Sequence, residues 1–253
     1  MKPFVSKKTF YRLKPTQNLK KAYGLVKMHK DGKPLRIIVS SLNSICSGAE
    51  NYLKNILQNF LPECKYSIES TKKFKTWFMQ ERKKFEKSDY QIVTLDVVKL
   101  YPSVDIEFFK KFITEVLTKF TSFECLSGYY KQTYGCNMGS KISPILSNIF
   151  LSILEAKFID ENINNGIILA YKRFVDDIFL VIKNTEKNNF FRKINNLHKG
   201  LKFTINEPIN KNLVFLDTCI FSKNNQYEIK NYRKPTASNV VTYFRKSETP
   251  IKY

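Results

Sequence analysis

The feature that most constrains the fold of this chain is an apolar run that two adjacent carboxylates interrupt. The run covers residues 167–182, and Asp176 and Asp177 stand between two segments rich in aliphatic and aromatic side chains. Because each segment has the length and composition of a buried strand, the pattern predicts a β-hairpin with acids at its turn. Neighbouring carboxylates between buried strands repel each other and lose hydration, so they require a compensating cation. A solvated Asp-Asp turn is the simpler alternative.

A third carboxylate stands at the end of another predicted strand. Residues 90–96 form a β-rich run that ends at Asp96, and Asp105 then caps a helix predicted to continue to about residue 120. Asp96 lies 80 residues before Asp176, so the fold must bring the two together. Acids at neighbouring strand ends are the constellation that a two-metal site requires. The alternative is that Asp96 only caps a loop.

The net charge indicates the kind of partner. The 253 residues include 43 Lys and Arg against 22 Asp and Glu, which gives a formal net charge of +21. This excess is far beyond what solubility requires and indicates a polyanion, with nucleic acid favoured over an anionic membrane. Hydrophobic residues make up 43% of the chain, which is enough for a substantial core.

Composition also excludes several kinds of chemistry. The five cysteines are scattered and odd in number, so neither a zinc site nor a disulfide framework is indicated, and only two histidines are present. Any chemistry therefore depends on carboxylates, lysines and arginines. No apolar stretch reaches the roughly 18–20 residues of a membrane-spanning helix, and the first residues lack the apolar core of a secretory signal. We expect a soluble, intracellular protein without a membrane partner.

A second hairpin is predicted near the N-terminus. Residues 23–40 read as two short strands around Asp31-Gly32, a strong turn signal. Four basic side chains surround this turn: Lys27, Lys30, Lys33 and Arg36. Such a cluster suits a triphosphate, because an arginine offers a bidentate fork and a lysine a point charge. The alternative is a solvated basic turn.

The other predicted elements complete a single domain. Helices are predicted over residues 47–60, 71–87, 143–162 and 188–199, and strands over residues 201–207, 213–221 and 227–232. Ser47 and Glu50 have the capping-box spacing, and Ser143 followed by Pro144 suits an N-cap and a first helical position. Glycines ahead of Ser143 let the backbone come close to a ligand, although a Gly-Ser stretch is more simply a loop.

Together, these motifs resemble reverse transcriptases in the order of their fingers and palm. The ordered set is Lys27 with Arg36, Asp96 with Tyr101, Met138-Gly139-Ser140 with Ser143-Pro144, and Phe174-Val175-Asp176-Asp177. The amino-acid sequences of these motifs are most similar to those of Penelope-like retroelements. Three features carry this closer match: Tyr23-Gly24-Leu25-Val26-Lys27-Met28-His29-Lys30 with Arg36-Ile37-Ile38-Val39-Ser40; Met138-Gly139-Ser140-Lys141-Ile142-Ser143-Pro144; and Phe215-Leu216-Asp217 followed by Tyr232-Arg233-Lys234-Pro235-Thr236. The resemblance spans roughly residues 11–250.

The resemblance implies an α+β right-hand palm, an antiparallel sheet backed by helices, with fingers attached. We therefore expect one reverse transcriptase domain over residues 1–253, with a basic N-terminal segment and fingers in 1–89. The palm, interleaved with fingers elements, would occupy 90–233, and 234–253 would begin a truncated thumb connection. On this expectation the thumb is largely absent.

The same resemblance implies RNA-directed DNA synthesis, in which a DNA primer is extended on an RNA template from deoxynucleoside triphosphates. Two Mg²⁺ ions would be needed, with Mn²⁺ a possible substitute, because hard cations prefer oxygen ligands. By the resemblance, Asp96 and Asp176 would bridge the metals, Asp177 would assist, and the carbonyl of Val97 would supply another ligand. A nuclear location follows only from the family and the charge.

Further roles follow from matching positions. Lys27 and Arg36 would hold the triphosphate, and Tyr101 would lie under the sugar and exclude a 2′-hydroxyl. Met138 and Gly139 would lie against the pair formed by template and nucleotide. The expected nucleic-acid contacts are Lys30, Lys33, Ser143, Phe215 and Lys234.

Three positions depart from the family pattern. Val26 stands where the family usually has proline, Phe174 where it often has tyrosine, and Lys141 where proline is common. None of these removes a metal ligand. Two other functions compete with the leading one: a catalytically inactive or degenerate palm that only binds nucleic acid, and an RNA-templated RNA polymerase, which would not be expected to place a ring at Tyr101.

Overall fold

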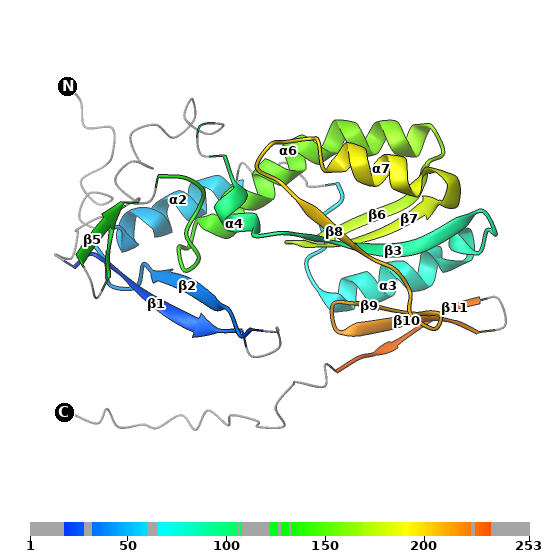
Figure 1. Cartoon of the computed structure of the whole chain (residues 1–253), viewed down its shortest axis with the longest axis horizontal. Helices are drawn as coiled ribbons and strands as arrows, with labels where there is room; N and C mark the ends of the chain where they lie inside the picture. The colour runs from blue at the N-terminus through cyan, green and yellow to red at the C-terminus, as the bar shows by residue number, and fades with distance from the viewer. Residues whose placement is uncertain are drawn as a thin grey trace.

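Four antiparallel strands form the central sheet of the computed structural model (Figure 1). The structure describes residues 18–27, 32–59, 65–105, 107, 122–125, 128–131, 133–223 and 226–233. The central sheet has the order β6-β7-β3-β8, and its strands are β3 (Tyr90–Val97), β6 (Ile168–Phe174), β7 (Asp177–Lys183) and β8 (Phe203–Asn206). The hairpin predicted over residues 167–182 and the strand predicted over 90–96 are therefore confirmed.

The long apolar run in β7 is explained by burial on both faces of this sheet. Successive side chains of a strand point to opposite faces. Ile178, Leu180 and Ile182 accordingly belong to one core cluster, and Phe179 and Val181 belong to another. All five are 0% exposed, and burial of each contributes about 1.5–3 kcal/mol. This burial determines the register of β7 and the position of the acids at its start.

Helices cover one face of the sheet and a mixed layer covers the other, as Figure 1 shows. The first layer contains α6 (Ser143–Asn164) and α7 (Lys187–Ile194), which follows the short 3₁₀ turn η3 (Asn184–Glu186). The second contains α3 (Thr71–Glu81), continued by the 3₁₀ turn η1 (Arg82–Phe85), and a small antiparallel sheet. The predicted helices at 71–87 and 188–199 are thus confirmed but end earlier.

The small sheet corrects one strand prediction. Its strands are β9 (Asn212–Phe215), β10 (Thr218–Lys223) and β11 (Gln226–Asn231), in the order β11-β10-β9. A single strand over residues 213–221 was wrong, because a tight turn interrupts it at Leu216, whose φ is +52°. The residue at this left-handed position is leucine, which is uncommon there. A glycine or asparagine, either of which would have marked the turn in the sequence, is not found at this position.

The basic hairpin, defined as β1 (Lys20–Val26) and β2 (Leu35–Ser40), belongs to a second sheet. That sheet has the order β2-β1-β4-β5, with β4 at Ser122–Cys125 and β5 at Gly128–Lys131. In Figure 1 it lies beside α2 (Ser47–Asn59) and α4 (Leu100–Ser103). The predicted hairpin at residues 23–40 and the helix predicted at residues 47–60 are both confirmed.

A buried ion pair joins the basic hairpin to α2. Lys20 Nζ lies 2.8 Å from Glu50 Oε1, and the two side chains are 1% and 0% exposed. The backbone N–H of Lys141 donates to Glu50 Oε2 at 3.0 Å. Burial alone would raise the pKa of the Glu50 carboxyl, but the Lys20 charge and these hydrogen bonds hold that pKa below its ordinary value. Glu50 therefore does not close the predicted capping box; its carboxylate connects β1, α2 and the segment before α6.

Two more expectations about helix ends need comment. Ser143 lies inside α6, and Ile142 is the N-cap, without a side-chain cap; the Ser143 hydroxyl instead donates to the carbonyl of Asn137 at 2.7 Å. The helix predicted after Asp105 lies mostly outside the described residues. At its start, the N–H of Glu107 donates to Asp105 Oδ1 at 2.9 Å, which is the contact of a capping aspartate. No helix in the described part of the chain is long and apolar enough to cross a membrane.

Candidate active site

The structure brings the three predicted aspartates together at one end of the central sheet. Asp96 is directly opposite Asp177 in the register of β3 and β7, an arrangement in which Cβ atoms lie about 4.5–5.5 Å apart on the same face. Asp176 lies in the turn before β7, and its carbonyl accepts the N–H of Val97 at 3.0 Å. That hydrogen bond fastens the turn to the end of β3. All three acids are partly buried.

This donor set suits Mg²⁺ bound together with a nucleotide. In the described part of the chain, no three His, Cys, Asp or Glu side chains lie close enough together to hold a metal ion by themselves. Mg²⁺ usually binds one or two carboxylates and takes its other ligands from water and substrate phosphates, rather than from an all-protein cage. Carboxylates from adjacent strand ends therefore fit the ion, provided that phosphate oxygens complete its coordination.

The acidic turn, defined as Val175 and Asp176, has a strained backbone. Phe174 and Asp177 pair across it and close the hairpin. Val175 has φ of +56°, a left-handed conformation that places its branched side chain in steric conflict with its own backbone. Such strain persists only where surrounding contacts impose it, and it gathers at functional sites. The residue before the acid is thus held in a disfavoured conformation.

Tyr101 lies where the acids and the basic hairpin meet. Its ring is partly buried and packs against the main core. Burial raises the pKa of its hydroxyl, and the charge of Asp176 raises it further while the charge of Arg36 opposes both. The hydroxyl is therefore within electrostatic reach of an acid from β6–β7 and an arginine from β2. The predicted contact of its ring with the sugar of a nucleotide stays a prediction.

Residues 135–139, called here the bridging loop, hold α4 and the basic hairpin together. Gly135 has φ of +74°, and a Cβ there would lie 2.4 Å from the carbonyl oxygen of Pro102. Gly139 has φ of +102°, and its Cβ would lie 2.6 Å from the carbonyl oxygen of Val39. Each glycine thus permits a backbone contact that any other residue would prevent. The close approach expected near Gly139 is therefore to the hairpin's own backbone.

Hydrogen bonds reinforce both contacts of the bridging loop. Val39 N–H donates to the Met138 carbonyl at 2.7 Å, and the Asn137 amide donates to the Val39 carbonyl at 3.1 Å. At the other end, the N–H of Cys136 donates to the carbonyl of Tyr101 at 2.7 Å. Met138 and Gly139 therefore lie between the Tyr101 turn and β2. Their predicted contact with a template–nucleotide pair stays a prediction.

The basic side chains in and beside the basic hairpin lie in different local environments. Arg36 is exposed on β2, opposite Leu25. Lys27 follows β1, where its N–H donates to the Pro34 carbonyl at 2.9 Å, and Lys33 is exposed with φ of +42°. Lys30 and Lys234, also predicted to contact nucleic acid, lie outside the described residues.

Two predicted nucleic-acid contacts have buried side chains. Phe215 is 2% exposed, and its ring centre lies 4.6 Å from that of Phe74 and 5.8 Å from that of Phe179. Ser143 is also 2% exposed, and its hydroxyl is hydrogen-bonded to the Asn137 carbonyl. Both expectations are corrected here, because each side chain packs or bonds within the protein and presents no surface to a nucleic acid.

Sequence reasoning missed the buried Arg173 and the tertiary partners of Glu50. It expected close backbone approach at the glycines ahead of Ser143 without identifying Pro102 and Val39 as the partners. A glycine beside Cys136 was a visible signal for close backbone approach. The sequence contained no such signal for Glu50 or Arg173, because a charged residue in a helix or strand is expected to be solvent-exposed unless its buried partner is known.

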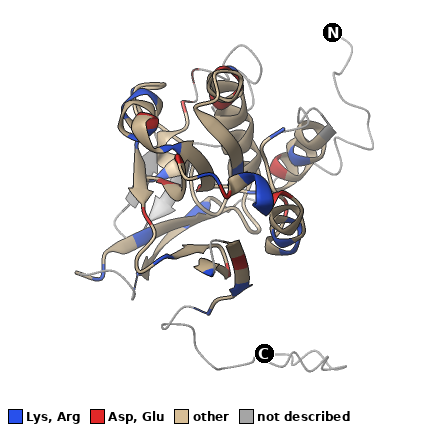
Figure 2. Cartoon of the chain, turned by 90° about the vertical axis from the view of Figure 1, so that its right-hand side faces the viewer, with Lys and Arg blue, Asp and Glu red and all other residues tan. Residues whose placement is uncertain are grey.

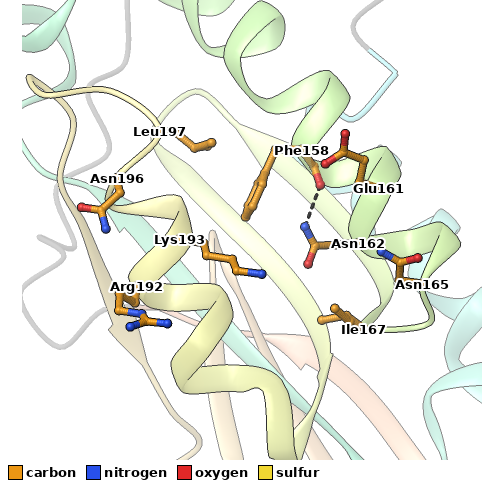
Figure 3. Close-up of a pocket in the computed structure, with 9 residues that line it drawn as sticks. All are labelled: Phe158, Glu161, Asn162, Asn165, Ile167, Arg192, Lys193, Asn196 and Leu197. Atoms are coloured by element: carbon orange, nitrogen blue, oxygen red, sulfur yellow. Dashed lines mark hydrogen bonds between the residues drawn. The ribbon is translucent and has the colours of Figure 1, made fainter.

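A cavity of about 540 Å³ lies between α6 and α7 (Figure 3). Asn162 from α6 and Lys193 from α7 are among its lining residues. Another, Ile167, precedes β6, at the end of the β6–β7 hairpin opposite the acidic turn. Because β7 has seven residues at about 3.3 Å each, the two ends lie roughly 20 Å apart. The cavity is therefore separate from the acids.

Solved polymerase structures share this arrangement of sheets and helices. Apo telomerase from Candida tropicalis superposes with a TM-score of 0.59 at 12% sequence identity, over 85% of this chain and 49% of that one. Telomerase from the same organism with the TWJ fragment of telomeric RNA gives 0.61 at 15% identity, over 89% and 47%. The BmCPV RNA-dependent RNA polymerase at the elongation state gives 0.51 at 11% identity, over 88% and 22%. The chain spans about half the length of the telomerase chains, and such low identities establish the fold alone.

Sequence comparison identifies the family. No curated protein sequence matches the chain significantly. The family model described as "Reverse transcriptase (RNA-dependent DNA polymerase)" matches residues 28–229, which include β2 of the basic hairpin, the bridging loop and all three aspartates. The chain, with its palm-like fold of helices and antiparallel sheets, therefore belongs to the reverse transcriptase family.

Proposed function

We propose that this chain extends a DNA primer on an RNA template by nucleotidyl transfer that depends on two Mg²⁺ ions. The observation that carries the proposal is the meeting of Asp96, Asp176 and Asp177 at one end of the central sheet. Family membership supports RNA-directed synthesis. The net charge of +21 also favours a polyanionic substrate.

The acids would bind the metal ions and the triphosphate oxygens would complete the coordination. In this assignment Asp96 and Asp176 would hold the ions, Asp177 would assist, and the Val97 carbonyl would be a further ligand. Bound Mg²⁺ supplies stabilisation of the charge that develops on the attacking and leaving oxygens during in-line displacement. The partly buried surroundings of the acids strengthen such charge interactions relative to water.

The surrounding residues would bind and orient the nucleotide. Arg36 and Lys27 neutralise the triphosphate, the first as a fork and the second as a point charge. Tyr101 presents its ring to the sugar and excludes a 2′-hydroxyl by steric conflict. Met138 and Gly139 would lie against the pair formed by template and nucleotide, and their position between the Tyr101 turn and β2 supports this role.

The distribution of cations supports binding along the strands of a primer–template. Figure 2 shows Lys and Arg on several helices and strands rather than on one element. Lys33 adds an exposed charge at the tip of the basic hairpin, and Lys30 and Lys234 are proposed to act in the same way. Binding through phosphates releases counterions, so affinity should fall steeply as salt rises.

The proposed biological setting is a Penelope-like retroelement, with action in the nucleus. The motif sequences at residues 23–40, 138–144 and 215–217 support this setting. Within those motifs, the structure gives Gly139 a packing reason, since a Cβ there would collide with Val39. Nuclear action rests on the family assignment and the basic charge.

The test is extension of a DNA primer on an RNA template with Mg²⁺ and the four deoxynucleotides, with wild type beside Asp176→Asn. We expect extension by wild type and loss of product in the variant, with equal primer–template binding measured by fluorescence anisotropy. Wild type that binds primer–template in a salt-dependent manner without extending it would instead identify a palm that binds nucleic acid without turnover.

A further inference from the structure

An arginine lies fully buried behind the acidic turn. Arg173 is 0% exposed, although arginine is almost never fully buried unless it is paired. It is the penultimate residue of β6, directly before Phe174 and the acidic turn. Its own backbone is paired independently of its side chain: its N–H donates to the Tyr66 carbonyl and its carbonyl accepts the Ile68 N–H, both at 2.8 Å.

Two side chains of α6 bind the guanidinium of Arg173, and one of them neutralises its charge. Its Nε lies 2.9 Å from both carboxylate oxygens of Glu155, and its Nη2 donates to Ser152 Oγ at 3.0 Å. The hydroxyl of Tyr171 donates to Glu155 Oε2 at 2.9 Å. Burial raises the pKa of Glu155, and the Arg173 charge opposes that rise. These contacts hold the planar guanidinium in one orientation.

The remaining contact of this guanidinium reaches the acidic turn. Arg173 Nη1 donates to the carbonyl oxygen of Val175 at 3.2 Å. That carbonyl belongs to the same peptide group as the N–H of Asp176, so the hydrogen bond fixes the plane from which Asp176 extends. Val175 has φ of +56°, a conformation that a β-branched residue leaves unless something holds it.

We propose that Arg173 is a positioning residue for the reaction: supported on α6 by Glu155 and Ser152, its guanidinium holds Val175 in the left-handed conformation and so directs the Asp176 carboxylate. This inference rests on the proposed function of Asp176 as a metal ligand. Lysine cannot replace the arginine, because one ammonium group cannot satisfy the carboxylate, the hydroxyl and the Val175 carbonyl with the geometry of a planar fork.

The test is a double-mutant cycle of Arg173→Lys and Val175→Gly. Glycine adopts left-handed φ without steric cost, so Val175→Gly removes the need for a holding contact while leaving the acids in place. Two quantities are measured for each variant: the Mg²⁺ concentration that gives half-maximal primer extension, and Mn²⁺ affinity by electron paramagnetic resonance. The second uses a complex with a dideoxy-terminated primer, an RNA template and the incoming nucleotide, so it requires no turnover.

Arg173→Lys should weaken Mn²⁺ binding and raise the half-maximal Mg²⁺ concentration by about tenfold or more, as loss of residues that orient metal ligands does elsewhere. Adding Val175→Gly should recover most of that loss, so the double variant binds metal nearly as well as Val175→Gly alone. Arg82→Lys is the matched control, because Arg82 Nη1 also donates to a backbone carbonyl, that of Tyr227 at 2.8 Å, far from the acids. It should change thermal stability and leave metal affinity unchanged.

The outcomes separate this inference from the proposed function. Wild type that binds Mn²⁺ in the complex but does not extend a primer contradicts the proposed function, while a tenfold loss of binding in Arg173→Lys still supports the positioning role. If the effects of the two substitutions on metal affinity are simply additive, the positioning role is overturned. So does an Arg173→Lys variant that is less stable than wild type yet has the same metal affinity.

Discussion

The acidic end of the central sheet and the basic hairpin are held in place in different ways. The strands that carry the acids are covered on both faces, and residues 178–182 of β7 have no exposed surface. The basic hairpin extends beyond its covered part, where Leu35 and Ile37 are each 65% exposed. A core therefore determines where the acids lie, whereas a small number of joints determines where Arg36 lies.

Those joints are the Glu50–Lys20 ion pair and the contact of Gly139 with Val39. Because the core is tightly packed, many buried side chains together determine the positions of the acids. The hairpin instead depends on a buried charge pair and a glycine. The difference predicts that changes at the acids remove chemistry without loss of stability, and that changes at the joints alter stability and nucleotide binding together.

The largest effect should follow Asp96→Asn, which keeps the size of the side chain and removes its charge. We expect kcat for primer extension to fall by more than about 10³-fold, as for other essential active-site groups, with a melting temperature close to that of wild type. Asp160→Asn is the matched control, since Asp160 is 42% exposed and pairs with Lys65; its kcat should stay within about twofold. Extension that survives in Asp96→Asn would place the chemistry elsewhere.

Glu50→Gln should be the most damaging change at a joint. It removes the carboxylate charge beside the buried Lys20 ammonium, and breaking such a pair costs about 3–5 kcal/mol. Unfolding in urea would measure this loss, with Glu69→Gln as control. Glu69 is 77% exposed where it pairs with Lys73, so its loss should cost less than about 1 kcal/mol.

The same joint has a pH signature. The pKa of Glu50 is lowered in the folded protein, so its stabilising contribution is present above its ordinary pKa of about 4.3 and is lost as the pH falls through the lower folded value. Glu50→Gln should therefore flatten this part of the stability profile. An unchanged profile would show that other carboxyl groups dominate acid unfolding.

Gly139→Ala should have an intermediate effect on stability. It combines a positive φ with a Cβ 2.6 Å from the Val39 carbonyl, and we expect a loss of about 2–4 kcal/mol from the strain and the collision together. Gly32→Ala isolates the strain, because Gly32 has φ of +71° with no atom within 4 Å of an added Cβ, and should cost about 1 kcal/mol. Gly139→Ala should also raise the KM for nucleotide, since it displaces β2. Equal losses in the two variants would mean that the joint adapts without cost.

The sequence predicted the acidic end of the sheet better than the joints. The apolar composition and bulk of residues 90–96 and 167–182 are local signals, and they place each acid at the end of a strand. These signals do not decide which strands pair, so the convergence of Asp96 with Asp177 was expected only from the resemblance to reverse transcriptases.

The joints could not be read in the same way, because each depends on a partner distant in the chain. Glu50 matched a capping box but binds Lys20 and the Lys141 N–H. Ser143 matched an N-cap but is bonded to Asn137, and the turn at Leu216 has no turn-forming residue at its positive φ. In each case a tertiary contact outweighed the local preference.

Tyr101 offers the sharpest test of the comparison, because both regions reach it through Asp176 and Arg36. Tyr101→Ala should lower the ratio of kcat/KM for deoxynucleotides over ribonucleotides by about tenfold or more, corresponding to about 1.4 kcal/mol of lost discrimination. Tyr101→Phe keeps the ring and removes the hydroxyl, so it should retain the sugar preference if exclusion is steric. Single-nucleotide incorporation assays measure both variants. An unchanged sugar preference in Tyr101→Ala would remove the ring from the sugar site and would leave RNA-templated RNA synthesis as a competing activity of this palm.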